Sequence, residues 1–533
     1  MKKALRPSSL LATLLFTTIF VSAQNPNPLF RHLPPNAERI YHINLPALTS
    51  KVSWEDLISA IPPSKSTSNQ QVMDILKDPS LAGVDIRQDL FIAQSGGDNK
   101  YDSTTYITLL VHLTDSGKFI AFMNGMEKDL HPLPMAKGPA RASAGGRLIG
   151  KDKTVMAYDD KLAVITIVTP AAKEVAASIQ KSAPGKKKAP IAMAHTLKAG
   201  RMSMAALRGF TNTIYTADPV FTAGFSDDAD FHMWGPHGEG ANKLMEMVKK
   251  KAMKDKNAIS MTRSTGLHTL TALRFEPGKI TMLTTTKVPQ DSLKNYRILN
   301  SRPLNTDLIN RLPGKAILGM VNLHFDPAFL TEFLERSGLR KTFDSALSSK
   351  GLTINDVIKA FKGDFLIAGM QPATLPDSGK GNPNIFFVTT IDPAAFMKLA
   401  GKLKLDSAGN LMGKMKTTYT LKDNILVAGK NKTLTDEYFS TTAVHSSNDL
   451  VNDRVRTNAF SLAVDVKAII AFMQEIYPNP TPKTQQLLHF LGALDRLTYT
   501  AGDMQNGLLE SYFELKMADA SENSLRSIFK LLH

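Results

Sequence analysis

The densest run of side chains able to do chemistry spans residues 227–239, with three aspartates, two histidines and one glutamate. If residues 229–234 form a strand, Asp230 and His232 project to the same face. With His237 in the following loop, they could bind a divalent ion such as zinc, or act as a base and its orienting acid. The same alternation is typical of a half-buried strand with one solvated face. We therefore treat Asp230, His232 and His237 as candidate ligand-binding residues and assign no catalytic or metal residue.

Two other segments resemble catalytic loops but lack a residue that the chemistry needs. Residues 145–151 have the spacing of a phosphate-binding loop, yet Asp152 stands where a hydroxyl must hold magnesium. Residues 224–228 begin like the nucleophile elbow of serine hydrolases, but Asp228 replaces the second glycine of that turn. The chain has no cysteine, which excludes thiolate nucleophiles and thiolate metal sites. We predict no cofactor.

The 23 methionines suggest a copper(I) site, because thioether sulfur selects that metal. The candidate ligands would be Met193, His195, Met202 and Met204. Residues 202–204 fit a strand whose alternate side chains face one core, and methionine is a common core filler. We interpret this set as core.

The first 23 residues have the pattern of a secretory signal peptide. Three basic residues among the first six precede an apolar stretch at 10–21, and small residues end at Ala23 before Gln24. The apolar stretch is shorter than the ~20 residues that a membrane-spanning helix needs. We predict cleavage between Ala23 and Gln24 and a periplasmic or secreted mature chain, with no later window apolar enough to form a transmembrane helix.

Composition predicts a globular chain whose partners, if charged, are anionic. At 533 residues and 43% hydrophobic content, the chain is long enough for about two to four domains with large cores. The formal charge is +16, and removal of the leader's three basic residues leaves +13 (16 − 3). Outside the inner membrane nucleic acid is scarce, so lipid head groups or anionic envelope polymers are the expected partners and nucleic acid is not.

The elements that would position these residues repeat along the chain. Leu33-Pro34 returns as Leu312-Pro313, a separation of 279 (312 − 33), and Asn44-Leu45 returns as Asn322-Leu323, a separation of 278 (322 − 44). Further landmarks keep the same order: residues 83–86 and 89–93 are echoed by 351–354 and 364–368. Each half closes with a predicted hairpin, around Pro277-Gly278 or Asn506-Gly507, and a final helix.

This order of elements predicts an α+β fold in two tandem divergent copies of a mixed sheet-plus-helix domain. The copies would span residues 24–300 and 301–533. The first copy has an insertion at about 217–255 with no counterpart in the second, and it contains all three candidate ligand-binding residues. Insertions on a duplicated scaffold are common places for new function.

The order of elements, the exported N-terminus and the Asn-Leu and Asp-Leu-Phe-Ile-Ala landmarks resemble an uncharacterised family of secreted Bacteroidota proteins, a domain-of-unknown-function family. The resemblance would cover nearly the whole mature chain. It implies an envelope location and transfers no known activity or catalytic residue. Many members look like lipoproteins, whereas this chain lacks the cysteine that such an anchor requires.

Three function classes follow from these patterns. The first is an exported, non-catalytic envelope protein with a binding or structural role and an unidentified ligand. The second is a metal-dependent or serine hydrolase that uses the 217–255 insertion, and the third is periplasmic metal handling. We predict the first, because no polar constellation in the sequence completes a known catalytic or metal-binding pattern.

Overall fold

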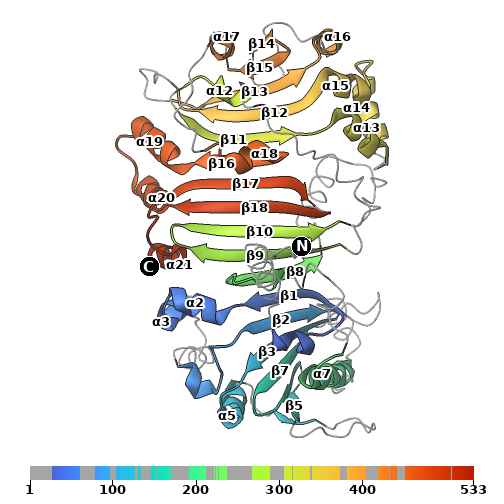
Figure 1. Ribbon diagram of the computed structural model, residues 1–533, viewed down its shortest axis with the longest axis vertical. Coiled ribbons are helices and arrows are strands. Elements are labelled where there is room, and N and C mark those ends of the chain that lie inside the picture. The colour runs from blue at the N-terminus through green and yellow to red at the C-terminus, as the bar shows by residue number, and fades with distance from the viewer. Residues whose placement is uncertain are drawn as a thin grey trace, which may run out of the picture. The chain divides into compact units, whose positions relative to one another are not determined.

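The computed structural model describes most of the chain between residues 27 and 532, and the structural statements below concern that part. The described residues are 27–59, 78–96, 104–126, 130–133, 146–151, 153–169, 191–211, 221, 224–225, 227–236, 267–288, 305, 307–314, 316–336, 339–372, 381–403, 418–430, 432–440, 450–505 and 507–532. The predicted leader, His237, Asp152 and the predicted boundary at residues 300–304 lie outside them. The chain forms two compact units, Met1–Gly235 and Pro236–His533 (Figure 1).

Helices and antiparallel strands are mixed in both units, which confirms the predicted α+β class. Neighbouring strands of the first unit pair in the order β8-β1-β2-β3-β7-β6-β5-β4. The elements are η1 (Pro28–His32), β1 (Ala37–Ile43), α2 (Leu45–Lys51), α3 (Trp54–Ser59), η2 (Pro79–Ala82), β2 (Leu90–Ser95), β3 (Thr105–His112), α5 (Ser116–Met126), β4 (His131–Pro132), β5 (Arg147–Lys151), β6 (Thr154–Tyr158), β7 (Leu162–Thr169), α7 (Ile191–Arg208) and β8 (Phe231–Pro236).

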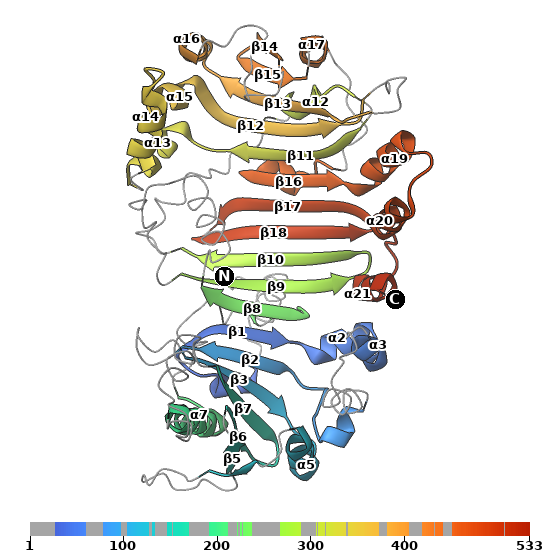
Figure 2. The same ribbon diagram turned by 180° about the vertical axis from the view of Figure 1, so that it is seen from behind.

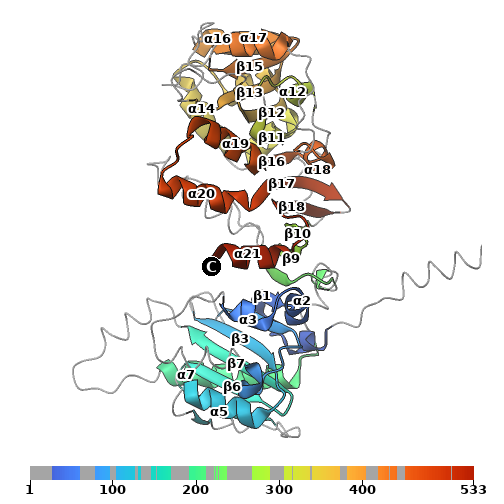
Figure 3. The ribbon, with the colours of Figure 1, turned by 90° about the vertical axis from the view of Figure 1, so that its left-hand side faces the viewer.

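Helices α5 and α7 cover opposite faces of the first sheet (Figure 3). Val155 of β6 packs with Ala199 of α7, whereas the next residue, Met156, packs with Phe119 of α5. Because both faces are covered, most of β6 and β7 is buried continuously rather than at alternate positions.

The second unit is one antiparallel sheet in the order β9-β10-β18-β17-β16-β11-β12-β13-β15-β14 (Figure 2). Its elements are β9 (His268–Glu276), β10 (Lys279–Lys287), α12 (Asp307–Asn310), β11 (Ile317–His324), α13 (Pro327–Arg336), α14 (Leu339–Ser348), α15 (Ile354–Ala360), β12 (Phe361–Met370), β13 (Asn384–Ile391), α16 (Pro393–Leu403), β14 (Thr418–Lys422), β15 (Ile425–Gly429), α17 (Lys432–Ser440), α18 (Asp453–Thr457), β16 (Phe460–Asp465), α19 (Val466–Ile476), α20 (Pro482–Gly492), β17 (Leu494–Gln505), β18 (Leu508–Met517) and α21 (Ser524–Leu532). Within the described residues, no helix combines the length and apolar character needed to span a bilayer.

Six strands of each unit follow the same order, β8-β1-β2-β3-β7-β6 in the first and β16-β11-β12-β13-β15-β14 in the second. In each set, the strand that comes first along the chain has an irregularity at the same place. It lies between Ala37 and Arg39 in β1 and between Ile317 and Gly319 in β11. In chain numbering, these irregularities are 280 residues apart (317 − 37).

The strand register differs from the sequence match by two residues at one landmark. Sequence similarity aligns Asn44 with Asn322, but the cross-strand partners place His42 and Asn322 at equivalent positions. Each is the direct partner of the second residue of the Leu90-Phe91 or Phe365-Leu366 pair. A two-residue shift keeps every side chain on the same face, so the apolar pattern of the sequence does not reveal it.

The compact units divide at a different point from the predicted repeats. The hairpin β9–β10 belongs to the predicted first copy, yet it lies in the second unit. There β10 pairs along its whole length with β18, from Lys279 opposite Lys516 to Lys287 opposite Leu508. The closing hairpins of the two predicted copies therefore share one sheet.

Residues 202–204, expected to form a strand, lie in helix α7, so that expectation is wrong. Ala199, Ser203 and Ala206 are fully buried, and their spacing of four and three residues is the helical period that the sequence interpretation missed. Met202 and Met204 are about 200° apart around such a helix and share no face. His195 of the same helix instead contacts the Tyr106 hydroxyl through Nδ1 at 2.9 Å.

Two glycines matched by sequence provide a test of local packing. Gly83 and Gly351 both have left-handed backbone, with φ of 65° and 61°. A Cβ added at Gly83 would overlap the Asp115 carbonyl oxygen, whereas a Cβ at Gly351 would have no atom within 4 Å.

We expect Gly351→Ala to cost about 1 kcal/mol, the conformational penalty of a left-handed alanine, and Gly83→Ala to cost at least ~2 kcal/mol more because of the added overlap. Calorimetric unfolding of the two variants beside the wild type measures the difference. Equal shifts in the melting temperature would contradict the packing described around Gly83.

Candidate functional site

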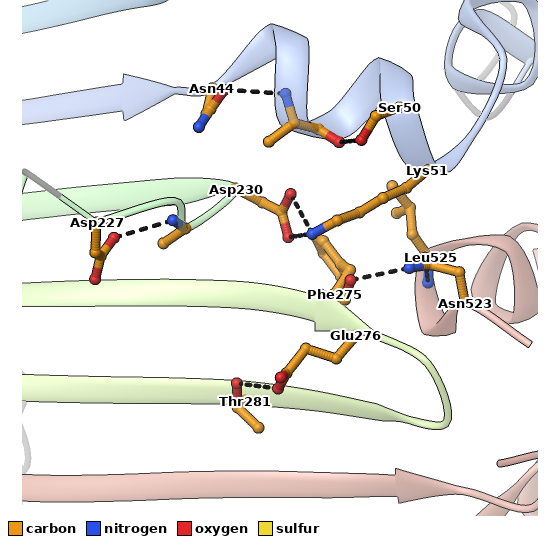
Figure 4. A network of polar contacts seen from close by, with 12 residues as sticks. Asn44, Ser50, Lys51, Asp227, Asp230, Phe275, Glu276, Thr281, Asn523 and Leu525 are labelled. Atoms are coloured by element: carbon orange, nitrogen blue, oxygen red, sulfur yellow. Dashed lines mark hydrogen bonds and ion pairs between the residues drawn. The ribbon is translucent and has the colours of Figure 1, made fainter. Parts of the chain in front are cut away.

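Asp230 precedes β8 and holds a buried charge. Its side chain is 0% exposed, and both carboxylate oxygens accept hydrogen bonds from the Lys51 ammonium, at 2.7 and 2.6 Å (Figure 4). Lys51 reaches this point from the last turn of α2, whose N-terminus is capped by the Asn44 side chain. The Asn44 backbone amide also donates to the Asp230 carbonyl oxygen at 2.9 Å. Asp230 thus ties the start of β8 to both ends of α2.

His232 lies two residues further along β8 and is 2% exposed. Its Nε2 lies 2.6 Å from Oδ1 of Asp227, and the same oxygen accepts the Ala229 backbone amide at 3.0 Å. Its Nδ1 lies 3.0 Å from Nδ1 of His42, its direct cross-strand partner in β1. Both ring nitrogens of His232 are therefore used within the fold.

His42 continues this chain of contacts toward β2. It is 5% exposed, and its Nε2 faces Oδ2 of Asp89 at 3.4 Å, an ion-pair distance without hydrogen-bond geometry. Asp89 also accepts a short hydrogen bond from the Asn27 side chain. We call the linear series Asp227, His232, His42 and Asp89 the imidazole relay.

Aromatic rings enclose the two imidazoles. His42 stacks on Phe91 with centroids 4.5 Å apart, and His232 stacks on Phe225 at 4.9 Å. Phe30 meets both phenylalanines edge-on, at 5.7 and 5.8 Å. These rings exclude water from the middle of the relay, while its carboxylate ends at Asp227 and Asp89 are 32% and 22% exposed.

The contact between the two Nδ1 atoms needs one ring to donate a proton and the other to accept it. Through this contact and the two carboxylate contacts, the relay links four segments of the chain: the turn at Asp227, β8, β1 and the residue before β2. It presents no nucleophile.

A neighbouring histidine connects the relay's surroundings to α7. His32 in η1 contacts the Ala206 carbonyl oxygen through Nδ1 at 2.7 Å and accepts from Arg31 Nε at 3.0 Å. Burial lowers the pKa of His32, which favours the neutral ring that this acceptor role requires. The helix η1 begins after Asn27, so the same short segment contacts both Asp89 and α7.

The structure corrects the environment predicted for the candidate residues. The alternation is as expected, but Asp230 and His232 face the buried side of β8, and Met233, 46% exposed, faces outward. The solvated polar face proposed from the sequence is therefore wrong. Asp230 contacts Lys51 and His232 contacts His42 and Asp227, so the two do not converge on a common ligand. Among the described residues, no group of three acidic or histidine side chains could hold a metal ion.

In the second unit, the equivalent position of the strand pair β11–β16 holds neutral polar side chains. Asn322 and Ser461 are direct partners in β11 and β16, both 0% exposed, and Asn322 Nδ2 donates to Ser461 Oγ at 3.4 Å. Asp364, within β12, instead binds the buried His324 and accepts a hydrogen bond from the Thr390 hydroxyl at 2.9 Å. Each unit thus buries a histidine beside an aspartate: His42 of β1 lies near Asp89, which precedes β2, and His324 of β11 binds Asp364 of β12.

Sequence reasoning missed Lys51, His42 and Asp89 as site residues. His42 alternates with Ile40 on the buried face of a strand, and a histidine at such a position needs a polar partner. The sequence therefore indicates that His42 needs a polar partner, but it does not indicate which residue that partner is.

Comparisons with known proteins leave the chain without an assigned family. No family model matches it, and no curated protein matches it. Solved structures of the protein TP0453 give weak similarity. Crystal form IV is 8% identical with a TM-score of 0.27, covering 53% of this chain and 89% of that one. Crystal form III is 9% identical with a TM-score of 0.26, at the same coverage. Similarity at this level carries no argument about fold or function.

We expect His232→Ala to destabilise the first unit by about 2–4 kcal/mol, because it leaves Asp227 and the buried His42 without their partner. Met233→Ala, one residue along on the exposed face, is the matched control and should cost under about 1 kcal/mol. Thermal unfolding of both variants measures the effect. If the two variants shift the melting temperature by similar amounts, the relay does not stabilise the pairing of β1 with β8.

Proposed function

We propose that this chain is an exported, non-catalytic protein of the cell envelope with a binding or structural role, built from a duplicated α+β domain. The observation that carries the proposal is that the polar side chains at the start of β8 contact other parts of the fold. Asp230 and His232 are buried, and their contacts join β8 to β1 and α2. A buried, internally paired set of this kind positions strands and does not face a substrate.

The hydrolase and metal-handling alternatives gain no support from this geometry. A zinc site would need a free nitrogen on His232, but its Nε2 and Nδ1 contact Asp227 and His42. Ser226, the serine of the segment that resembles a nucleophile elbow, lies outside the described residues.

Domain duplication is supported by three properties that the two units share. The order of six strands is the same, and the irregularity falls at the same place in β1 and β11. A buried polar pair also occupies the equivalent position of β1–β8 and β11–β16. Hydrogen-bond register and irregularities of this kind are specific features of a sheet, so their coincidence supports common descent of the halves better than apolar landmarks do.

The envelope location is supported by the N-terminal sequence pattern and by charge. The leader has basic, apolar and small-residue segments in the required order. A net charge of +13 after removal of the leader (16 − 3) suits association with anionic head groups or envelope polymers.

Native mass spectrometry of the protein purified from the exported fraction tests location and activity class together. We expect a mass that begins at Gln24 and carries no stoichiometric zinc after incubation with the metal. A mass that includes residues 1–23 would contradict cleavage after Ala23, and absence of the protein from the exported fraction would contradict export. One zinc per chain, lost in His232→Ala but retained in Met233→Ala, would instead favour the metal-dependent hydrolase.

A further inference from the structure

Helix α20 is a surface helix that buries none of its residues. It contacts α19 and the end of β17 (Figure 3). Its N-terminus is well formed: the Thr481 side chain accepts the Thr484 backbone amide, and proline occupies the first turn. The helix is thus held in place while presenting a full side to solvent.

The side chains of α20 separate into two stripes. Thr484, Leu488 and Leu491 are half-buried and face the unit. Lys483, Leu487 and Phe490 form the outer stripe, at the same spacing of four and three residues. Leu487 is 48% exposed and Phe490 is 49% exposed.

Tyr477, the residue that caps the end of α19, adds a third exposed apolar side chain, at 55%. A single exposed leucine is ordinary, but Leu487, Phe490 and Tyr477 are three of the ten large apolar side chains exposed in the described chain. Leu487 and Phe490 lie about one turn apart on α20, and Tyr477 caps α19, the helix that α20 contacts. Exposed apolar side chains grouped on two contacting helices are typical of an interaction surface.

Charge selects the occupant of this surface. Residues 477–493 contain Lys483 and no carboxylate, and the chain without its leader carries +13 (16 − 3). Leucine, phenylalanine and tyrosine beside a lysine suit the head-group region of an anionic bilayer, where rings and aliphatic chains enter and the ammonium pairs with phosphate. A second copy of the same stripe would bring two Lys483 ammonium groups together across a twofold axis, which is unfavourable.

We propose that the outer stripe of α20, together with Tyr477, binds the surface of an anionic lipid bilayer. Leu487 and Phe490 enter the head-group region, and Lys483 pairs with lipid phosphate. This inference rests on the proposed envelope location and specifies the partner within it.

Sedimentation with phosphatidylglycerol/phosphatidylcholine vesicles tests the proposal on the full purified chain. We expect Leu487→Ser/Phe490→Ser to lower the fraction bound to vesicles by about tenfold or more. The matched control is Phe343→Ser/Met397→Ser, which removes exposed apolar side chains from α14 and α16 and should change binding by less than about twofold. Lys483→Gln should weaken binding to anionic vesicles and leave binding to pure phosphatidylcholine vesicles unchanged. All variants share the same N-terminus, so differences between them report on the helices.

Three results would overturn the assignment. One is a wild-type chain that does not sediment with anionic vesicles, and another is equal loss in the α20 and control variants. The third is a dimer in solution that the α20 variant dissociates while vesicle binding is unchanged. Vesicle binding uses purified protein, so a failure here is distinguishable from a failure of export, which the N-terminal mass reports.

Discussion

Burial of polar and charged side chains where β1 pairs with β8 is the constraint on which the first unit depends. A carboxylate and two imidazoles leave water there, and each costs several kcal/mol unless it is paired. Their partners come from α2, β1, the segment before β2 and the turn at Asp227. A slip of one residue between β1 and β8 would put Met233 in place of His232 and leave the buried polar side chains without their partners. The apolar core stabilises the unit, and the polar contacts select its register.

In the second unit, neutral side chains form the buried polar pair at the equivalent position of β11 and β16. Asn322 and Ser461 occupy the positions of His42 and His232, and the aspartate of the second strand contacts His324 instead. The demand for a buried polar pair therefore belongs to the shared strand arrangement, whereas the charged relay is particular to the first unit. If the halves descend from one domain, this position is where they diverged in chemistry while keeping their geometry.

The sequence predicted much of the fold, because most of its elements have local signals. The hairpins at Pro277-Gly278 and Asn506-Gly507 are correctly located, and the final helix carries Leu525 and Phe529 as expected. The sequence also predicted that Asp230 and His232 share a face. It did not predict that this face is buried, because their burial depends on Lys51 and His42, which lie nearly two hundred residues away along the chain. Pairing over such distances is a property of strand register, which periodicity of two cannot specify.

His42 and His232 act as one buried unit that is committed to the fold. A double-mutant cycle with His42→Leu and His232→Leu tests this coupling by measuring the unfolding free energy of both single variants and of the pair. Each single change leaves the buried Nδ1 of the other imidazole without its partner, whereas the double change removes both nitrogens. We expect the two single losses together to exceed the loss in the double variant by about 1–3 kcal/mol. Losses that add to within about 0.5 kcal/mol would contradict it.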